Sequence, residues 1–293
     1  MDPLKQSYWQ CLLEKKRFEN KVKNWLRLWQ GRSKHNVLRT FWFEERKNFG
    51  DLFTPLFIKH AGYTAVNGTI EKAQMFATGS IIQLAPESFS GTIIGSGIIK
   101  EQHIRLPKAN ILSVRGLLTK KCLGIEGDMP LGDPGLIACD FIEQPQEQIY
   151  DLGVVAHYVD KNLPAIAKLT RLASSRVKII DVEQSALQVT HQIAQCKHIV
   201  SSSLHGIIVA DSLDIPCAWI IVSEHVIGNG FKFSDYRSAF GEQITPLKID
   251  GSESIDSLIS ATSSRDHNVT KKLQGSIRQV FQQYFESLKN STT

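Results

Sequence analysis

The chain has 293 residues, of which 42% are hydrophobic and 22% are charged, a composition typical of a soluble globular protein with one large or two modest domains. Residues 1–34 contain nine basic and three acidic residues, a net charge of +6, whereas the 25 basic and 26 acidic residues that follow give a net charge of −1. The charge of the body of the chain therefore argues against nucleic-acid binding. The whole chain has five cysteines and no CxxC pair, which argues against a disulfide framework or a zinc site.

The first predicted element is a helix over residues 4–30, in which apolar side chains recur at three- and four-residue steps. Its basic, tryptophan-rich character is typical of an interfacial helix that contacts anionic lipid or a lipid-linked acceptor. The alternative is that the same stripe packs on the body of the protein or on a second subunit of a homo-oligomer. The opening residues lack the pattern of a signal peptide, and no apolar run approaches the roughly 20 residues that span a bilayer. We therefore expect a cytoplasmic protein, at the inner face of the membrane if the helix is interfacial.

Strands and helices alternate along residues 36–145, which we predict to form a first domain on the acceptor side of a cleft. The expected strands cover residues 37–43, 73–78, 92–94 and 109–114. One expected helix follows residue 51, and two others cover residues 117–123 and 135–141.

The alternation restarts after a glutamine-rich linker and predicts a second domain, on the donor side, over residues 146–265. Its expected strands cover 152–158, 177–182, 198–200 and 218–222, and its expected helices cover 163–172, 184–195 and 204–213. The predicted fold class is therefore α/β, with two Rossmann-like, doubly wound parallel sheets facing one cleft. A terminal helix over 266–293 is expected to cross back to the first domain.

Polar residues follow two predicted strands of the first domain, where α/β proteins place their ligand sites. Asp51 lies near a helix start, so it either caps that helix or presents a carboxylate to the cleft. Arg115 follows the strand over 109–114, and an arginine at this position suits a bidentate grip on a carboxylate or phosphate. Gly95 and Gly97 allow close approach of the backbone to a ligand or a tight junction between a strand and a helix.

The stretch HIVSSSLHGIIVADSLDIPC places His205 at a strand-to-helix turn. Backbone N–H groups converge at such a turn, and the helix dipole favours an anion there. The histidines of the chain show no HxxxH or HExxH spacing, so we expect no metal centre. A G-x-S-x-G elbow and a P-loop are also absent.

Six motifs occur in an order that resembles the polysaccharide pyruvyl transferase family across residues 37–241. They are NFGDLFTP, GTIIGSGI, SVRGLLTKKCLG with a downstream DP, HYVD, SSSLHGIIVADSLDIP and GFKFSDY. The resemblance implies transfer of the pyruvate group of phosphoenolpyruvate onto two hydroxyls of a sugar, with formation of a cyclic ketal and release of phosphate. It also implies a fold like that of the two-domain GT-B glycosyltransferases, a sugar or lipid-linked oligosaccharide acceptor, and no cofactor besides the donor substrate.

The resemblance also implies roles for individual residues. His205 would deliver a proton to the vinyl carbon of the donor, Arg115 would hold the donor carboxylate or phosphate, and Asp51 would accept a proton from the sugar hydroxyl. The remaining expected substrate-binding residues are Gly95, Ser96, Gly97, His157, Ser202, Ser203, Leu204 and Lys232. This family often has arginine before the leucine–histidine pair, where this chain has Ser203, so Lys232 or Arg237 would supply the missing phosphate contact.

Two other functions are compatible with the pattern. A GT-B glycosyltransferase that uses a nucleotide sugar would need a carboxylate on the ribose, and Glu183, after the strand over 177–182, is the candidate for it. A non-catalytic assembly protein would use the basic N-terminal helix to dock on a membrane synthase.

Overall fold

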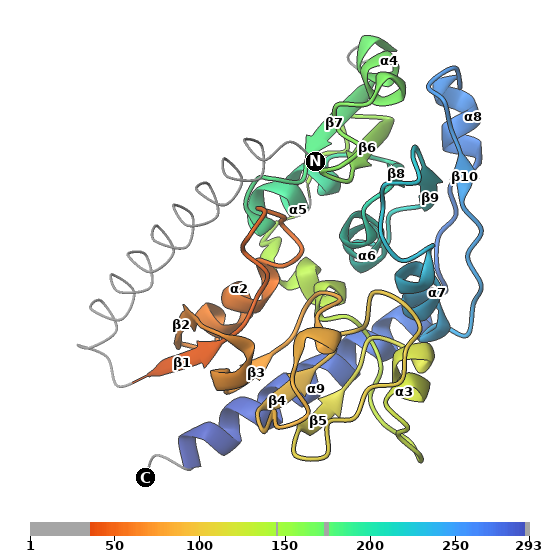
Figure 1. Ribbon diagram of the computed structural model, residues 1–293. Coiled ribbons are helices and arrows are strands. Elements are labelled where there is room, and N and C mark those ends of the chain that lie inside the picture. Colours follow the sequence, from red (N-terminus) through yellow and green to blue (C-terminus); the bar gives the residue numbers. More distant parts are fainter. Residues whose placement is uncertain (1–35, 145, 173–175, 291–293) are drawn as a thin grey trace, which may run out of the picture.

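The computed structural model describes residues 36–144, 146–172 and 176–290, so the predicted helix over residues 4–30 lies outside the described residues. A first sheet occupies the N-terminal half, with parallel strands in the order β2-β1-β3-β4-β5 (Figure 1). The strands are β1 (Val37–Thr40), β2 (Thr64–Asn67), β3 (Met75–Phe76), β4 (Thr92–Ile94) and β5 (Asn110–Ser113). The helical segments of this half are α2 (Phe53–His60), η1 (Ile70–Lys72), η2 (Ile82–Leu84), α3 (Leu117–Cys122) and η3 (Pro134–Phe141), where η marks a 3-10 helix.

A second parallel sheet follows, with strands in the order β10-β9-β8-β6-β7. The strands are β6 (Leu152–Ala156), β7 (Val177–Asp181), β8 (Ile199–Ser201), β9 (Cys217–Ile221) and β10 (Leu247–Lys248). The helices of this half are α4 (Pro164–Leu172), α5 (Ala186–Ala194), α6 (Leu204–Ser212), α7 (Phe231–Ser238), α8 (Ile255–Ser260) and α9 (His267–Asn290). All five residues of β6 are buried, as expected for a parallel strand that is covered on both faces.

The predicted α/β fold with two parallel sheets is confirmed, and the structure corrects several of its elements. The short helix predicted over 135–141 is present as a 3-10 helix, Pro134–Phe141, which is kinked at Ile137. The strand predicted over 73–78 shortens to the two residues of β3. Strands β2 and β10 were not predicted, because both are short edge strands with few buried side chains and therefore lack an apolar run.

Helix α6 lies at the centre of the molecule and is buried along its whole length. It packs against strand β8 on one side and against η3, which belongs to the N-terminal half, on the other. A helix whose residues are all buried, with mostly apolar side chains around it, is stable only in such a surrounding. The first turn of α6 is therefore held rigidly at the junction of the two halves.

Helix α9 returns to the first sheet and crosses the molecule (Figure 1). The Phe281 ring packs on Phe57 of α2 with centroids 5.2 Å apart, and Phe285 stacks on Tyr63 at 5.4 Å. One hydrophobic cluster therefore contains residues of both halves and of α9. None of the helices in the described ranges is long and apolar enough to cross a bilayer.

Candidate active site

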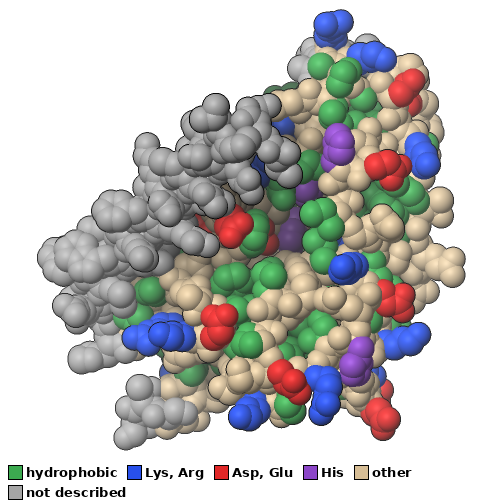
Figure 2. Space-filling model, viewed as in Figure 1, with side chains coloured by type: hydrophobic (Ala, Val, Ile, Leu, Met, Phe, Trp, Pro, Cys, Tyr) green, Lys and Arg blue, Asp and Glu red, His purple; other side chains and the backbone are tan. Residues whose placement is uncertain are grey.

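A cavity of about 300 Å³ lies between loops of the two halves, at the carboxyl ends of strands from both sheets. A hollow in the face shown in Figure 2 has histidine side chains at its floor, and His157 and His205 line the cavity. We call it the central cavity. Its polar lining consists of Asn48, Asp51, Ser80, Gln83, His157, Tyr158, Ser203, His205 and Lys232, and its apolar lining consists of Phe43, Ile81, Leu84, Ile99, Leu204 and Ile227. Five of the sequence-predicted polar residues thus meet in one place: Asp51, His157, Ser203, His205 and Lys232.

The serines before α6 shape the turn that presents His205. Ser201 Oγ donates to the carbonyl oxygen of Ser203 at 2.7 Å and accepts from the Ser203 N–H at 3.0 Å. Ser202 Oγ accepts from the His157 N–H at 2.9 Å, and Ser202 does not line the central cavity. Two of the three serines therefore order the backbone, and Ser203 is the one that lines the central cavity.

His205 is 6% exposed and is enclosed by both halves. Its Nδ1 edge lies against Gly50, where a Cβ atom would overlap the ring. Burial, followed by the charges of Arg115 and Lys232, lowers the pKa of His205 to about 3. The imidazole is therefore neutral at physiological pH in this environment, and added negative charge in the cavity would help it to carry a proton.

Asp51 is not the cap of α2, because Leu52 occupies the N-cap position and makes no side-chain cap bond. The Asp51 side chain instead faces the cavity and accepts a hydrogen bond from Asn48 Nδ2 at 3.1 Å. Burial raises its pKa to about 7, against the lowering effects of Asn48 and Lys232. Gly79, with φ +102°, leaves room for this carboxylate, since a Cβ there would lie 2.8 Å from Asp51 Oδ1.

Lys232 brings a positive charge into the central cavity from the first turn of α7. Among the residues that the structure describes, no carboxylate lies within ion-pair distance, 4.0 Å, of its ammonium group. Burial lowers the pKa of Lys232 to about 8, and the more distant charges of Asp51 and Asp160 only partly offset this effect. The ammonium group lies 5.6 Å from the centre of the Phe233 ring, a cation–π distance, and no carboxylate among the described residues forms an ion pair with it.

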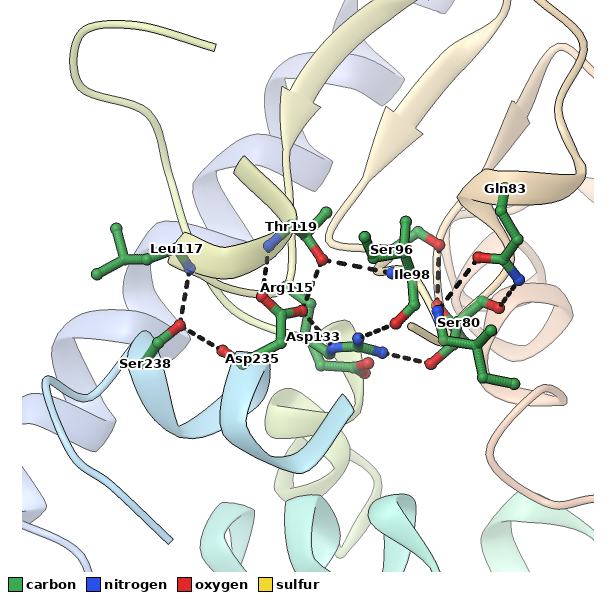
Figure 3. Close-up of polar contacts among 12 residues, drawn as sticks. Ser80, Gln83, Ser96, Ile98, Arg115, Leu117, Thr119, Asp133, Asp235 and Ser238 are labelled. Atoms are coloured by element: carbon green, nitrogen blue, oxygen red, sulfur yellow. Dashed lines mark hydrogen bonds and ion pairs between the residues drawn. The ribbon is translucent and has the colours of Figure 1, made fainter. Parts of the chain in front are cut away.

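Arg115 is fully buried and does not line the central cavity. Figure 3 shows its polar contacts. Its Nε donates to Asp235 Oδ2 at 2.8 Å, Nη1 to Ser80 Oγ at 2.6 Å and Nη2 to the Ile98 carbonyl oxygen at 2.7 Å. Asp235 also accepts from the backbone N–H and the hydroxyl of Thr119, both at 2.7 Å. Arg115 therefore binds α7 to the first half, and it reaches the cavity only through Ser80.

The glycine turn after β4 supports Arg115 instead of lining the cavity. A Cβ at Gly97 would overlap the Arg115 guanidinium, and Ser96 Oγ donates to the Gly79 carbonyl oxygen at 2.9 Å. Gly95, with φ +70°, packs against Pro134. Gly95, Ser96 and Gly97 were predicted to bind substrate in the donor or acceptor pocket, and the structure places none of the three in the lining of the central cavity.

Arg237, the alternative phosphate ligand, and Glu183, the candidate ribose ligand of a glycosyltransferase, both form ion pairs with other residues. Arg237 is buried with its Nη1 2.7 Å from Asp211 Oδ2. Glu183 pairs with Lys161 and lies 3.6 Å from Arg46 Nε, and it does not line the central cavity. Lys232 is thus the predicted cation that faces the cavity.

Sequence reasoning missed Asp133, Asn48 and Ser80. Asp133 is fully buried, and its Oδ2 lies 3.8 Å from Nε2 of His205. The available signal was the aspartate–proline pair at the start of η3, because Asp133 Oδ1 accepts the Gly135 N–H at 2.9 Å in the manner of a cap. No group of three or more His, Cys, Asp or Glu side chains within the described ranges could hold a metal ion.

Comparisons with known proteins point to one family. A sequence model described as polysaccharide pyruvyl transferase matches residues 40–224. The chain is 34% identical over 176 residues to an uncharacterized protein of Acanthamoeba polyphaga mimivirus, covering 54% of this chain and 58% of the viral protein. It is 27% identical over 230 residues to the succinoglycan biosynthesis protein ExoV of Rhizobium meliloti, covering 75% of this chain and 70% of that protein. No solved structure matches the chain.

Proposed function

Because this chain belongs to the polysaccharide pyruvyl transferase family, we propose that it transfers the pyruvate group of phosphoenolpyruvate to two hydroxyls of a polysaccharide sugar or of its lipid-linked precursor. The observation that carries the proposal is the central cavity, where one unpaired cation, a neutral histidine and a carboxyl group of raised pKa meet. The similarity to a protein of succinoglycan biosynthesis supports a polysaccharide acceptor.

The proposed reaction sets the number of protons that the site must move. The donor carbon C2 forms bonds to two sugar oxygens, and its bond to the phosphate oxygen breaks. One hydroxyl proton is added to the vinyl carbon C3, which becomes a methyl group, and the other leaves with the phosphate. Each proton of the sugar therefore passes to the donor, and the protein needs a group that first accepts a proton and then donates it.

His205 fits this task because it is neutral before the donor binds. Its low pKa results from burial and from nearby cations, and a bound phosphate and carboxylate would counter both effects. The imidazole can then hold a proton and deliver it to C3. Lys232 and the N–H groups at the start of α6, beside Ser203 and Leu204, would take the anionic oxygens of the donor.

Asp51 lies on the wall of the cavity contributed by the first half, where the acceptor would enter. With a pKa of about 7, its carboxyl group changes protonation near neutral pH and can accept the proton of an attacking hydroxyl. Arg115 serves this arrangement indirectly, since it fixes Ser80 and α7 and thereby sets the position of Lys232.

The test is to incubate the full chain with phosphoenolpyruvate and a panel of galactosides and N-acetylhexosamines, and to follow phosphate release together with ketal formation by NMR. We expect stoichiometric release and ketal formation with at least one acceptor, and loss of both in the His205→Ala variant.

A parallel thermal-shift series separates this reaction from glycosyl transfer. We expect phosphoenolpyruvate to raise the melting temperature and nucleoside diphosphates to leave it unchanged, because Glu183 is already engaged by Lys161 and Arg46. Stabilisation by nucleotides alone would favour the glycosyltransferase instead.

A further inference from the structure

The Asp133 carboxylate and the His205 imidazole face each other across the junction of the two halves. Asp133 precedes η3 in the first half, and His205 lies in the first turn of α6 in the second. Asp133 Oδ2 and His205 Nε2 are 3.8 Å apart, which is longer than a hydrogen bond. Both atoms are buried and have no hydrogen-bond partner in the part of the chain that the structure describes.

Two such atoms at this distance indicate a pair that closes by a small side-chain rotation. A buried polar atom without a partner costs about 1–3 kcal/mol, and a shift of less than about 1 Å would give each atom its partner. Gly135 leaves room beside the Asp133 carboxylate, because a Cβ there would lie only 3.2 Å from Asp133 Oδ1.

From this geometry we infer that Asp133 is a positioning residue, which accepts the Nε2–H of His205 and leaves Nδ1 as the nitrogen that exchanges a proton with the substrate. The inference rests on the proposed function for the identity of that substrate. Nε2 is buried without a hydrogen-bond partner among the described residues, whereas the Nδ1 edge lies beside Gly50, whose missing side chain makes room for the ring that lines the central cavity. The carboxylate fixes one tautomer and stabilises the imidazolium once it forms.

The surrounding charges allow Asp133 to act as a carboxylate. Burial raises its pKa to about 6, while the nearby Arg115 lowers it and Asp235 raises it. The group is therefore mostly ionised at physiological pH. The charged or titratable groups that act on His205 itself are Arg115, Lys232 and His157, each of which disfavours the imidazolium, so Asp133 is the neighbour that can stabilise it.

The decisive variant is Asp133→Asn in the full chain. The asparagine Oδ1 can still accept the Gly135 N–H, so the start of η3 is preserved, but its amide would donate to Nε2 and favour the other tautomer. We expect kcat to fall by a factor of about 100 or more with little change in the KM for phosphoenolpyruvate, as for other dyads with the wrong tautomer.

The tautomer itself is measured by ¹⁵N NMR of histidine-labelled protein without any substrate, with His205→Gln assigning the signals. We expect the proton on Nε2 in the wild type and on Nδ1 in Asp133→Asn. The matched control is Asp266→Asn, since Asp266 Oδ1 accepts the N–H two residues on, at 2.8 Å, at the exposed start of α9. This control should change neither the tautomer nor kcat.

A wild-type proton on Nδ1, or an Asp133→Asn variant that keeps both tautomer and kcat, would overturn the inference. If Asp133→Asn does not fold, the wild-type tautomer alone decides. The NMR measurement needs no substrate, so it is independent of the proposed function. If the wild-type chain shows the Nε2 tautomer but no pyruvyl transfer, the proposed function is disproved, whereas the positioning of His205 by Asp133 is supported.

Discussion

Replacing Lys232 by methionine should weaken donor binding and stabilise the fold at the same time. Methionine keeps much of the apolar stem of the side chain and removes the cation from the central cavity. In the folded protein the ammonium group bears a desolvation cost, which appears as the lowering of its pKa from 10.5 to about 8. A bound anion offsets that cost, whereas the unliganded protein carries it in full.

The size of both effects follows from the contacts of Lys232. A charge-assisted hydrogen bond contributes about 1.5–3 kcal/mol, so Lys232→Met should reduce the affinity for phosphoenolpyruvate by roughly 10- to 150-fold. The pKa shift corresponds to a cost of at most about 3 kcal/mol, and the variant should be more stable by up to this amount below pH 8. This cost is lost as the pH rises from 8 towards 10.5, because the lysine then becomes neutral in both the folded and the unfolded state.

Titration calorimetry with phosphoenolpyruvate, on both sides of pH 8, measures the first effect, and urea unfolding measures the second. The affinity of the wild type for phosphoenolpyruvate should fall above pH 8, because Lys232 then loses its charge. The affinity of the variant should show no such fall. Lys272→Met, at an exposed position of α9, is the charge-matched control and should behave as the wild type. Unchanged affinity in Lys232→Met would refute the assignment of Lys232 to the donor anion.

Four further outcomes test the site. His205→Ala should lower kcat at least ~100-fold without changing the urea midpoint, and retained turnover would exclude His205 as the proton carrier. Arg115→Met should destabilise the fold by about 3–5 kcal/mol in urea unfolding, because it leaves a buried carboxylate unpaired, and a smaller loss would show that the ion pair is weak. Gly50→Ala should lower activity in the phosphate-release assay as much as His205→Ala does, because the new Cβ would displace the His205 ring. The control Gly275→Ala, where a Cβ would meet no other atom, should leave activity unchanged. Asp51→Asn should be more stable than the wild type above pH 7, by up to about 4 kcal/mol. Folding raises the pKa of Asp51, so the wild type loses stability as the pH rises from 3.8 to about 7, whereas the variant does not. Melting temperatures of the two proteins that change in the same way across this pH range would contradict the prediction.

The sheets and the residues at their carboxyl edges could be predicted from the sequence. The alternation of buried strands and amphipathic helices is a local property, and residues that follow such strands gather at one edge whatever the details of packing. Asp51, His157 and His205 were found in this way, and the structure brings all three to the central cavity.

Side-chain partners distant in the sequence could not be predicted. Arg115 also follows a strand, but its guanidinium turns away from the cavity because Asp235, 120 residues later, lies in a fully buried position beside it. The burial of Asp133 could not be predicted either, because it depends on α6 packing over η3. In both cases the local pattern indicates the residue type but not the direction of the side chain.

The ion pair between Arg115 and Asp235 has a consequence for how substrates enter. Two-sheet enzymes often open and close around their ligands by a hinge motion between the halves. Here an opening that carries α7 away from the first half would separate a fully buried charge pair and break the hydrogen bonds that Arg115 and Thr119 donate to Asp235, so the closed arrangement is favoured. We therefore expect the proposed donor to bind to a preformed site. Its association rate should depend on the mobility of the loops around the central cavity rather than on movement of whole domains.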